Sequence, residues 1–253
     1  MKLDPSQAVG QIAVDHIQAI AVFERYHIDY SCDSSKSLRE ACRLADAELA
    51  DVLEDIQHAP SRPPDGWEGG KDWIHESLAG MVEYIVRIHH TYTRSQLNRI
   101  ENIIDRMAAN QGAQNADMGA LQRLFVKMAE ETREHLKMEE EVVFPFLVRA
   151  EQAFDRGEPI PQPFKDSNFF NHPLRVLMWE HGLLGKEWRE IHSLTHHFQP
   201  PEDERKLYQP LYEALKALEK DTRRHIHLEN NILLKKAVQM GFLNQPGEAN
   251  GRP

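Results

Sequence analysis

The chain has few cysteines, no long hydrophobic run and no excess of positive charge. Of its 253 residues only Cys32 and Cys42 are cysteines, so there is neither a disulfide framework nor a CxxC pair. No apolar run approaches the roughly 18 residues that a membrane-spanning helix needs. The first residues, MKLDPSQAVGQ, contain no apolar signal segment. These absences predict a soluble protein of a reducing cytoplasm with no place in a membrane.

The charge balance points away from nucleic acids. The formal net charge is −10, whereas contacts with phosphates require a basic surface. Hydrophobic residues make up 41% of the chain and charged residues 28%, which is enough apolar material for a folded core. We therefore expect a folded protein without a nucleic-acid partner.

Proline and glycine divide the chain into domains. The stretch HAPSRPPDGWEGGKD holds three Pro and three Gly and predicts a linker over residues 58–72. Residues 1–57 predict a small helical N-terminal domain, and residues 241–253 a flexible tail. No alternating strand pattern appears between them. The fold class predicted is all-α.

The long middle part, residues 73–240, predicts an antiparallel four-helix bundle. Four segments with helical spacing of apolar residues are separated by Gly-, Pro- or polar-rich loops. They cover about 73–109, 118–150, 173–196 and 202–240. The core of such a bundle is a common place for a metal site.

Two of these segments place a histidine four residues before a glutamate. The pairs are His135 with Glu139, in HLKMEEEVVFPF, and His225 with Glu229, in HIHLENNILL. Residues at i and i+4 share one helix face, with Cβ atoms roughly 5–6 Å apart. The spacing also occurs by chance, and a solvated surface pair is the simplest alternative. Apolar residues at helical offsets around both pairs favour burial, where a carboxylate needs a partner or a metal.

The other two segments each offer one histidine on an apolar stripe. His89 follows such a stripe on the first helix, and His181 lies on one on the third; either alone would suit a core histidine. His90 shares a face with charged residues and is expected to point to solvent. His192 and His196 also lie at i and i+4, but close to a helix end, and we interpret them as a surface pair.

Together these side chains predict a metal site with six ligands: His89, His135, Glu139, His181, His225 and Glu229. Four imidazoles and two carboxylates are too many for one tetrahedral zinc ion. They suit two adjacent iron ions with an oxo or hydroxo bridge, and manganese remains open from ligand type. Glu139, rather than Glu140 or Glu141, should bridge the ions, since it alone lies one turn beyond His135.

Each histidine–glutamate pair has an acid one turn earlier, Glu131 before His135 and Asp221 before His225. We expect these two carboxylates to orient the ligand imidazoles or to line an access path without binding the metal. Glu180, next to His181, is a third candidate for the same role.

The motifs resemble those of a known family. HLKMEEEVVFP is similar to H-x-x-x-E-E-x-x-x-F-P, and HIHLENNIL to H-I-x-L-E-N-N-x-L, of the di-iron iron–sulfur cluster repair proteins. These proteins have a hemerythrin-like bundle after a small cysteine-containing domain, which VFERYHIDYSCDSSKSLREAC resembles. The resemblance implies a non-haem di-iron centre, a response to nitrosative and oxidative stress, damaged iron–sulfur proteins as transient partners, and a homodimer.

The chain departs from that family in its cysteines. The family usually has adjacent cysteines followed by glycines, where this chain reads Ser31, Cys32, Asp33, Ser34. Cys32 is a candidate for a thiol role, with a small packing residue as the alternative.

Three functional classes remain at this stage. The first is repair of damaged clusters by supply of iron. The second is binding or sensing of O₂ or NO at an open iron position, and the third is reduction of NO or peroxide at the di-iron centre. The N-terminal domain favours repair, because a simple oxygen carrier has no evident need for it.

Overall fold

The computed structural model describes residues 3–62, 67, 72–111, 116–161, 173–200 and 202–242. Every regular element within these ranges is helical, which confirms the all-α prediction. Most of the predicted linker, 58–72, and of the predicted tail, 241–253, lies outside the described residues. The elements are α1 (Val9–Asp15), α2 (Gln18–Arg25), α3 (Leu38–Leu44), α4 (Leu49–His58), α5 (Leu78–Tyr84), η1 (Ile85–His90), α6 (Thr91–Gln111), α7 (Ala116–Met138), η3 (Glu139–Val143), α8 (Phe144–Asp155), α9 (Pro173–Leu194), η4 (Glu202–Glu204), α10 (Arg205–His227), η5 (Leu228–Leu233) and α11 (Leu234–Gln239).

The chain divides into two compact units. Unit 1 joins residues 1–81 to residues 223–253, and unit 2 comprises residues 82–222. Unit 1 therefore combines the N-terminal helices with the last part of the chain. Each unit is described separately below.

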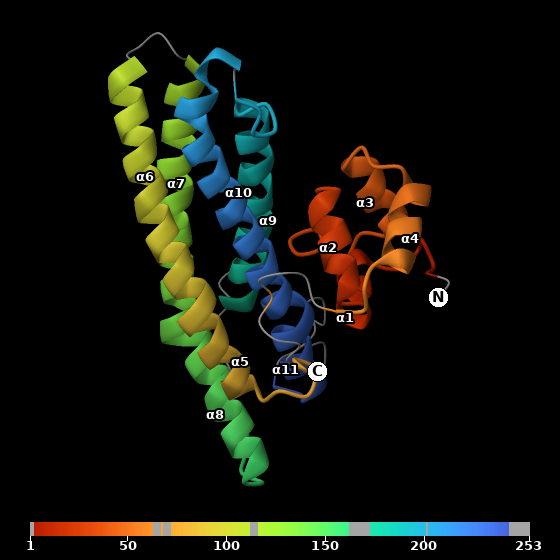
Figure 1. Ribbon diagram of the computed structural model, residues 1–253. Helices are drawn as coiled ribbons and strands as arrows, with labels where there is room; N and C mark the ends of the chain where they lie inside the picture. The colour runs from red at the N-terminus through yellow and green to blue at the C-terminus, as the bar shows by residue number, and fades with distance from the viewer. Residues whose placement is uncertain are drawn as a thin grey trace, which may run out of the picture. The chain divides into compact units, whose positions relative to one another are not determined.

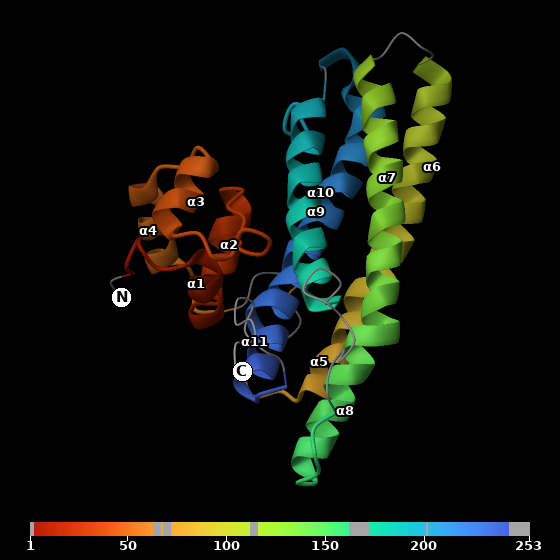
Figure 2. The ribbon, with the colours of Figure 1, turned by 180° about the vertical axis from the view of Figure 1, so that it is seen from behind.

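Unit 2 holds the helical bundle, in which α6, α7, α9 and α10 run side by side (Figures 1 and 2). All four helices contribute buried side chains to one core at helical spacing. Burying each large side chain contributes about 1.5–3 kcal/mol relative to leaving it exposed. Representative members are Leu97, Ile100 and Ile104 of α6, Leu121, Phe125 and Met128 of α7, Trp188 and Ile191 of α9, and Leu211, Leu215 and Leu218 of α10.

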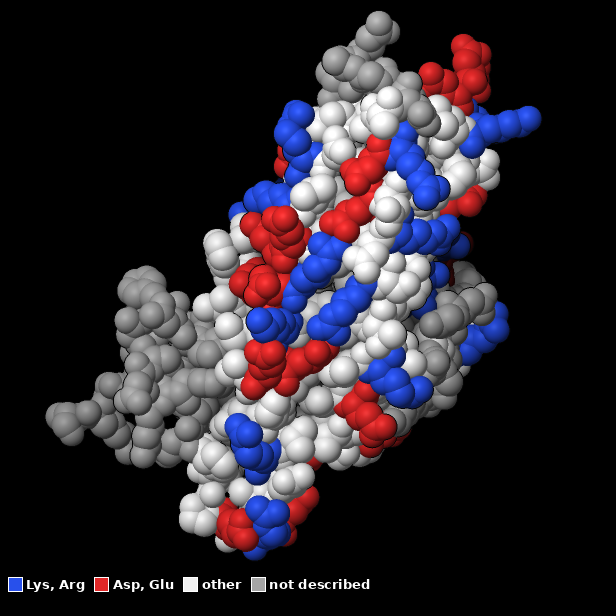
Figure 3. Space-filling view, turned by 90° about the vertical axis from the view of Figure 1, so that its left-hand side faces the viewer, with Lys and Arg blue, Asp and Glu red and all other residues white. Residues whose placement is uncertain are grey.

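Charged side chains cover the outside of the bundle. Arg133 of α7 reaches Glu101 of α6, with its two terminal nitrogens 3.0 and 2.5 Å from the carboxylate oxygens. On the face drawn in Figure 3, Lys and Arg are interspersed with Asp and Glu, and neither sign forms a large patch. Such a face is solvated and mixed in charge. In the described part of the chain, no helix has the length and apolar character that crossing a bilayer requires.

The N-terminal helices α1 to α4 of unit 1 pack around their own apolar core. Ile12, Ile20, Phe23 and Ile56 are buried in it. Helix α3 begins at a serine cap, because the Ser37 hydroxyl accepts a hydrogen bond from the Glu40 backbone N–H at 3.2 Å. The same unit contains η5 and α11 from the other end of the sequence.

Candidate metal centre

Among the described residues, three helices contain a short π-helical turn. The turns are η1 (Ile85–His90), η3 (Glu139–Val143) and η5 (Leu228–Leu233). Each contains at least one histidine or glutamate able to bind a metal: His90 in η1, Glu139 in η3 and Glu229 in η5. Wide turns of this kind are rare and occur often at functional sites. They also rotate the following residues relative to a regular α-helix, which changes the side chains that face inward.

In unit 2, Glu139 lies among three histidines. Its Oε1 is 3.2 Å from Nε2 of His135 and 4.0 Å from Nε2 of His181, and its Oε2 is 3.4 Å from Nε2 of His90. The Nε2 atoms of His135 and His181 are 2.9 Å apart. All four side chains are buried. The two oxygens of this carboxylate thus face different imidazoles.

Two other carboxylates contact the Nδ1 atoms of the His135 and His90 rings, on the side away from Glu139. Nδ1 of His135 is 2.7 Å from Oε2 of Glu180, and Nδ1 of His90 is 2.6 Å from Oε1 of Glu140. Arg94 also donates to Glu140, at 2.8 Å. Burial acts to raise the pKa of Glu140, but the hydrogen bonds from Arg94 and His90 outweigh it and lower that pKa. Both rings are therefore fixed by anions on their outer side.

The expectation that His90 points to solvent is wrong. His90 is fully buried, and its ring stacks on Phe144 with centroids 5.6 Å apart. His89 is also buried, and its Nδ1 is 3.0 Å from Oδ1 of Asp221. Among the described residues, the side chains close enough to share one ion include His90 and not His89. The physical reason is η1, whose wide turn shifts the helix phase on which the sequence argument relied.

The interpretation of His192 as a surface residue is also wrong. Its side chain is buried, and its Nε2 is 3.0 Å from both carboxylate oxygens of Glu219. His196 is exposed and has a positive φ of 48° beyond the end of α9. The two therefore do not form a chelating pair. Glu219, on α10, is the partner of the buried His192 imidazole. Because it lies 27 positions away in the sequence, the helical spacing around His192 did not indicate this contact.

In unit 1, His225 and Glu229 form the second predicted pair. Nε2 of His225 is 2.7 Å from Oε1 of Glu229, and both side chains are buried. His227, on the same helix, is fully buried, and burial lowers its pKa to about 3. The imidazole of His227 is consequently neutral near neutral pH.

The donor set of unit 2 fits a cation. When the Nδ1–H groups of His135 and His90 donate hydrogen bonds to Glu180 and Glu140, each neutral ring has a lone pair on Nε2. Both lone pairs then face the carboxylate of Glu139, at 3.2 and 3.4 Å. Buried acceptors that face one another are unfavourable unless a cation lies between them. The same carboxylate–histidine arrangement is usual around protein metal ions.

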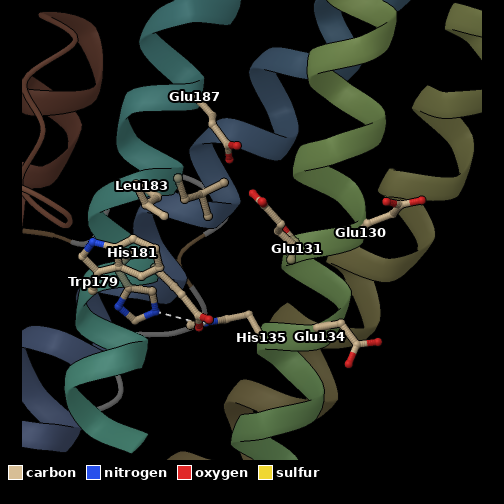
Figure 4. Close-up of a pocket in the computed structure, with 11 residues that line it drawn as sticks. Glu130, Glu131, Glu134, His135, Trp179, His181, Leu183 and Glu187 are labelled. Atoms are coloured by element: carbon tan, nitrogen blue, oxygen red, sulfur yellow. Dashed lines mark hydrogen bonds and ion pairs between the residues drawn. The ribbon is translucent and has the colours of Figure 1, made fainter. Parts of the chain in front are cut away.

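A cavity of about 320 Å³ lies between α7 and α9, with His135 and His181 in its wall. Figure 4 shows Glu131 pointing across it toward α9, while Glu130 and Glu134 extend from the other side of α7. Glu131 is 2.8 Å from Nζ of Lys127, which is also 2.6 Å from Glu187. Glu131 thus lines the cavity, whereas the carboxylates in contact with imidazoles are Glu180, on His135, and Asp221, on His89.

Cys32 lies in a loop organised by Asp29. Oδ1 of Asp29 accepts hydrogen bonds from the backbone N–H groups of Ser31 and Cys32, at 3.0 and 2.9 Å. Burial, and then the nearby Asp29 carboxylate, raise the pKa of the Cys32 thiol. A raised pKa leaves little thiolate, and the thiolate is the reactive form.

We expect the Cys32 thiol to react slowly. In a Cys42→Ser variant, iodoacetamide should alkylate Cys32 far more slowly in the native protein than in the unfolded chain at about pH 8, near the ordinary cysteine pKa. The native rate should still be rising above that pH, because the folded-state pKa is raised. Mass spectrometry of timed samples measures both rates. Equal rates in the native and unfolded chain would contradict this prediction.

Comparison with known families identifies the bundle. Residues 81–237 match the model of the hemerythrin HHE cation binding domain. The chain belongs to the hemerythrin HHE family. The match includes all the helices that carry the predicted ligands, and it begins before η1 and ends after η5. Residues 5–60 match a domain of unknown function, DUF542, so the hemerythrin domain follows a second recognised domain.

Curated relatives share both parts of the chain. A probable iron–sulfur cluster repair protein of Haemophilus influenzae is 28% identical over 236 residues, which cover 92% of this chain and 96% of that protein. The iron–sulfur cluster repair protein YtfE of Yersinia pseudotuberculosis is 24% identical, covering 92% and 97%. ScdA of Staphylococcus haemolyticus, with the same description, is 23% identical, covering 90% and 96%. The resemblance based on the motifs is confirmed.

Proposed function

We propose that this protein binds two iron ions in its hemerythrin domain and supplies iron for the repair of damaged iron–sulfur clusters. The proposed ligands are His90, His135, Glu139, His181, His225 and Glu229. The observation that carries the proposal is the buried Glu139 carboxylate, whose two oxygens face the Nε2 atoms of different histidines. His90 replaces His89 in the set predicted from sequence.

His225 and Glu229 enter this set from the other unit. Their support is the family match, which treats residues 81–237 as one cation-binding domain and so includes both halves of the ligand set. His225 and Glu229 contribute a second buried nitrogen–oxygen pair, 2.7 Å apart. Six donors exceed the four that a zinc site uses, and mixed imidazole and carboxylate ligands suit iron.

The residues of the chain would hold and guide the iron. Glu180 and Glu140 accept hydrogen bonds from the Nδ1–H groups of His135 and His90. The proton of each ring therefore stays on Nδ1, and each Nε2 is available to a cation. Glu131, Glu180 and Glu187 in the cavity wall would give a cation an acidic approach to His135 and His181. Iron held there would be a source of Fe²⁺ for a cluster that has lost an iron atom.

Repair is favoured over the other classes by the relatives, since three proteins that share both domains are named for it. We propose that this activity is required under nitrosative or oxidative stress, when iron–sulfur clusters lose iron. Damaged iron–sulfur proteins would be transient partners of the chain.

An iron-transfer assay tests this function. Protein loaded anaerobically with Fe²⁺ and freed of excess metal should retain two irons per chain. It should then restore activity to an enzyme whose [4Fe–4S] cluster has lost one iron, with a reductant and a chelator of free Fe²⁺ present. The Glu139→Ala variant, carried through the same loading, should restore little.

The same preparation separates the alternatives. Iron that stays on the chain while the acceptor stays inactive would contradict repair. Catalytic consumption of NO or peroxide with retained iron would assign a reductase, and reversible binding of O₂ or NO alone would assign a carrier or sensor.

A further inference from the structure

The helix that carries His225 and Glu229 is also in contact with the N-terminal domain. Between and beside these two residues lie Arg224, His227 and Asn231, and each of them contacts residues of the N-terminal domain or the segment after it. We call the contacts of these three residues with Glu24, Tyr30 and Gly10 the seam. All of them lie within unit 1.

The seam contains a buried ion pair. Nε of Arg224 is 2.6 Å from Oε1 of Glu24, and Nη2 is 3.0 Å from Oε2. The two side chains are only 6% and 13% exposed. The Arg224 guanidinium also lies 5.7 Å from the ring centroid of Trp67. Because the pair is buried and bidentate, removal of one partner is costly, and we expect it to loosen the helix around Arg224.

The second part of the seam is a hydrogen-bonded contact through Asn231. Nδ2 of Asn231 donates to the backbone carbonyl of Tyr30 at 3.1 Å and lies 2.9 Å from Nδ1 of His227. The Tyr30 and His227 rings meet edge to face, with centroids 5.4 Å apart. A Cβ at Gly10 would lie 2.6 Å from Oδ1 of Asn231 and 2.6 Å from Cβ of Ser34. Helix α1 can approach Asn231 this closely only because residue 10 is glycine.

The positions of these residues relate the seam to the metal ligands. Arg224 and His227 lie on either side of His225, and Asn231 follows Glu229 by two residues in the π-helical turn η5. A π-helical turn is rare, and its geometry depends on support from packing. The seam supplies contacts at both ends of the segment that contains the two ligands.

We propose that the N-terminal domain holds this helix in the register that aims His225 and Glu229 at the metal. Glu24 and Gly10 are then positioning residues for metal retention, although neither touches a ligand. This inference rests on His225 and Glu229 being metal ligands, as proposed above. It assigns the N-terminal domain a role in the metal centre that does not depend on a cysteine thiol.

The test uses the full-length protein loaded with Fe²⁺ under anaerobic conditions. Glu24→Gln and Gly10→Ala should release iron to a chelator about tenfold faster than the unaltered protein, at the lower end of the roughly 10–100-fold losses seen for supporting residues. Glu40→Gln is the matched control, because Glu40 forms an exposed ion pair with Arg43 in the same domain. Its release rate should be unchanged.

A second control separates positioning from stability. Ile56→Ala opens a cavity in the core of the N-terminal domain without removing a seam contact, and should lower the unfolding temperature without speeding iron release. The visible spectrum of Co²⁺-substituted protein should change in Glu24→Gln and not in Ile56→Ala, since that spectrum reports ligand geometry. Glu24→Asp, which keeps the charge, should restore part of the retention.

The outcomes distinguish the two proposals. Equal release from Glu24→Gln and Glu40→Gln, or equally fast release from Ile56→Ala, would overturn the role of the seam while the metal site stands. Faster release from the two seam variants, combined with no delivery of iron by the unaltered protein, would support the seam and contradict repair. Unaltered protein that retains no metal would overturn both.

Discussion

Replacing Glu139 with alanine is expected to remove most of the bound iron. Glu139 is 1% exposed, and its two oxygens face His135 and His90 at 3.2 and 3.4 Å. One substitution therefore removes a donor from both proposed ions and leaves two imidazoles without the anion that offsets a cation. The loss should exceed the roughly 10–100-fold that follows removal of a supporting residue. Iron per chain after dialysis against a weak chelator measures it.

The neighbouring glutamates are matched controls for this variant. Glu140→Ala should keep the full iron content at saturation but bind iron roughly 10–100-fold more weakly, because Glu140 holds Nδ1 of His90. Glu141→Ala should behave as the unaltered protein, since Glu141 is exposed. Equal losses of iron from Glu139→Ala and Glu141→Ala would show that the inward face of η3 has been assigned incorrectly.

Replacing His90 with alanine should also cause a large loss of iron. Nε2 of His90 is directed at Glu139, and its Nδ1 is fixed by Glu140 at 2.6 Å. The variant removes a proposed ligand, so iron per chain should fall well below that of the unaltered protein even with excess Fe²⁺ in the loading step. Titration with Fe²⁺, followed by metal analysis, measures both the affinity and the number of ions.

His89→Ala is the matched control for His90→Ala. His89 is buried next to His90, and its Nδ1 lies on Asp221 at 3.0 Å, so its loss should alter stability or affinity without removing an ion. Circular dichroism on both variants checks that they fold. If His89→Ala loses iron and His90→Ala retains it, the sequence-based choice of His89 is right and the structure-based one is wrong.

Local periodicity predicted the helices and the two histidine–glutamate pairs. A helix repeats every 3.6 residues whatever packs against it, so His135 with Glu139 and His225 with Glu229 share a face in any helical structure of this chain. Apolar residues at the same spacing marked that face as inward. The bundle and its buried pairs therefore follow from residues close together in the sequence.

The choice between His89 and His90 required the tertiary structure. A regular α-helix places His90 among charged residues, but η1 widens the turn and buries both histidines. Whether a wide turn forms depends on the side chains packed against it, such as Phe144 and Glu140 for His90. These residues lie about fifty positions away, beyond the range of any helix pattern.

The sequence by itself determined that this is an all-α protein with acid–histidine pairs inside a helical bundle, because helix period and burial are encoded locally. Only the tertiary structure decided which carboxylate supports each imidazole, such as Glu180 for His135, and which contacts join the N-terminal helices to the segment of His225 and Glu229. The hydrogen bonds from Arg224 to Glu24 and from Asn231 to Tyr30 pair residues 200 and 201 positions apart. They form only when the whole chain has folded, so no local pattern records them.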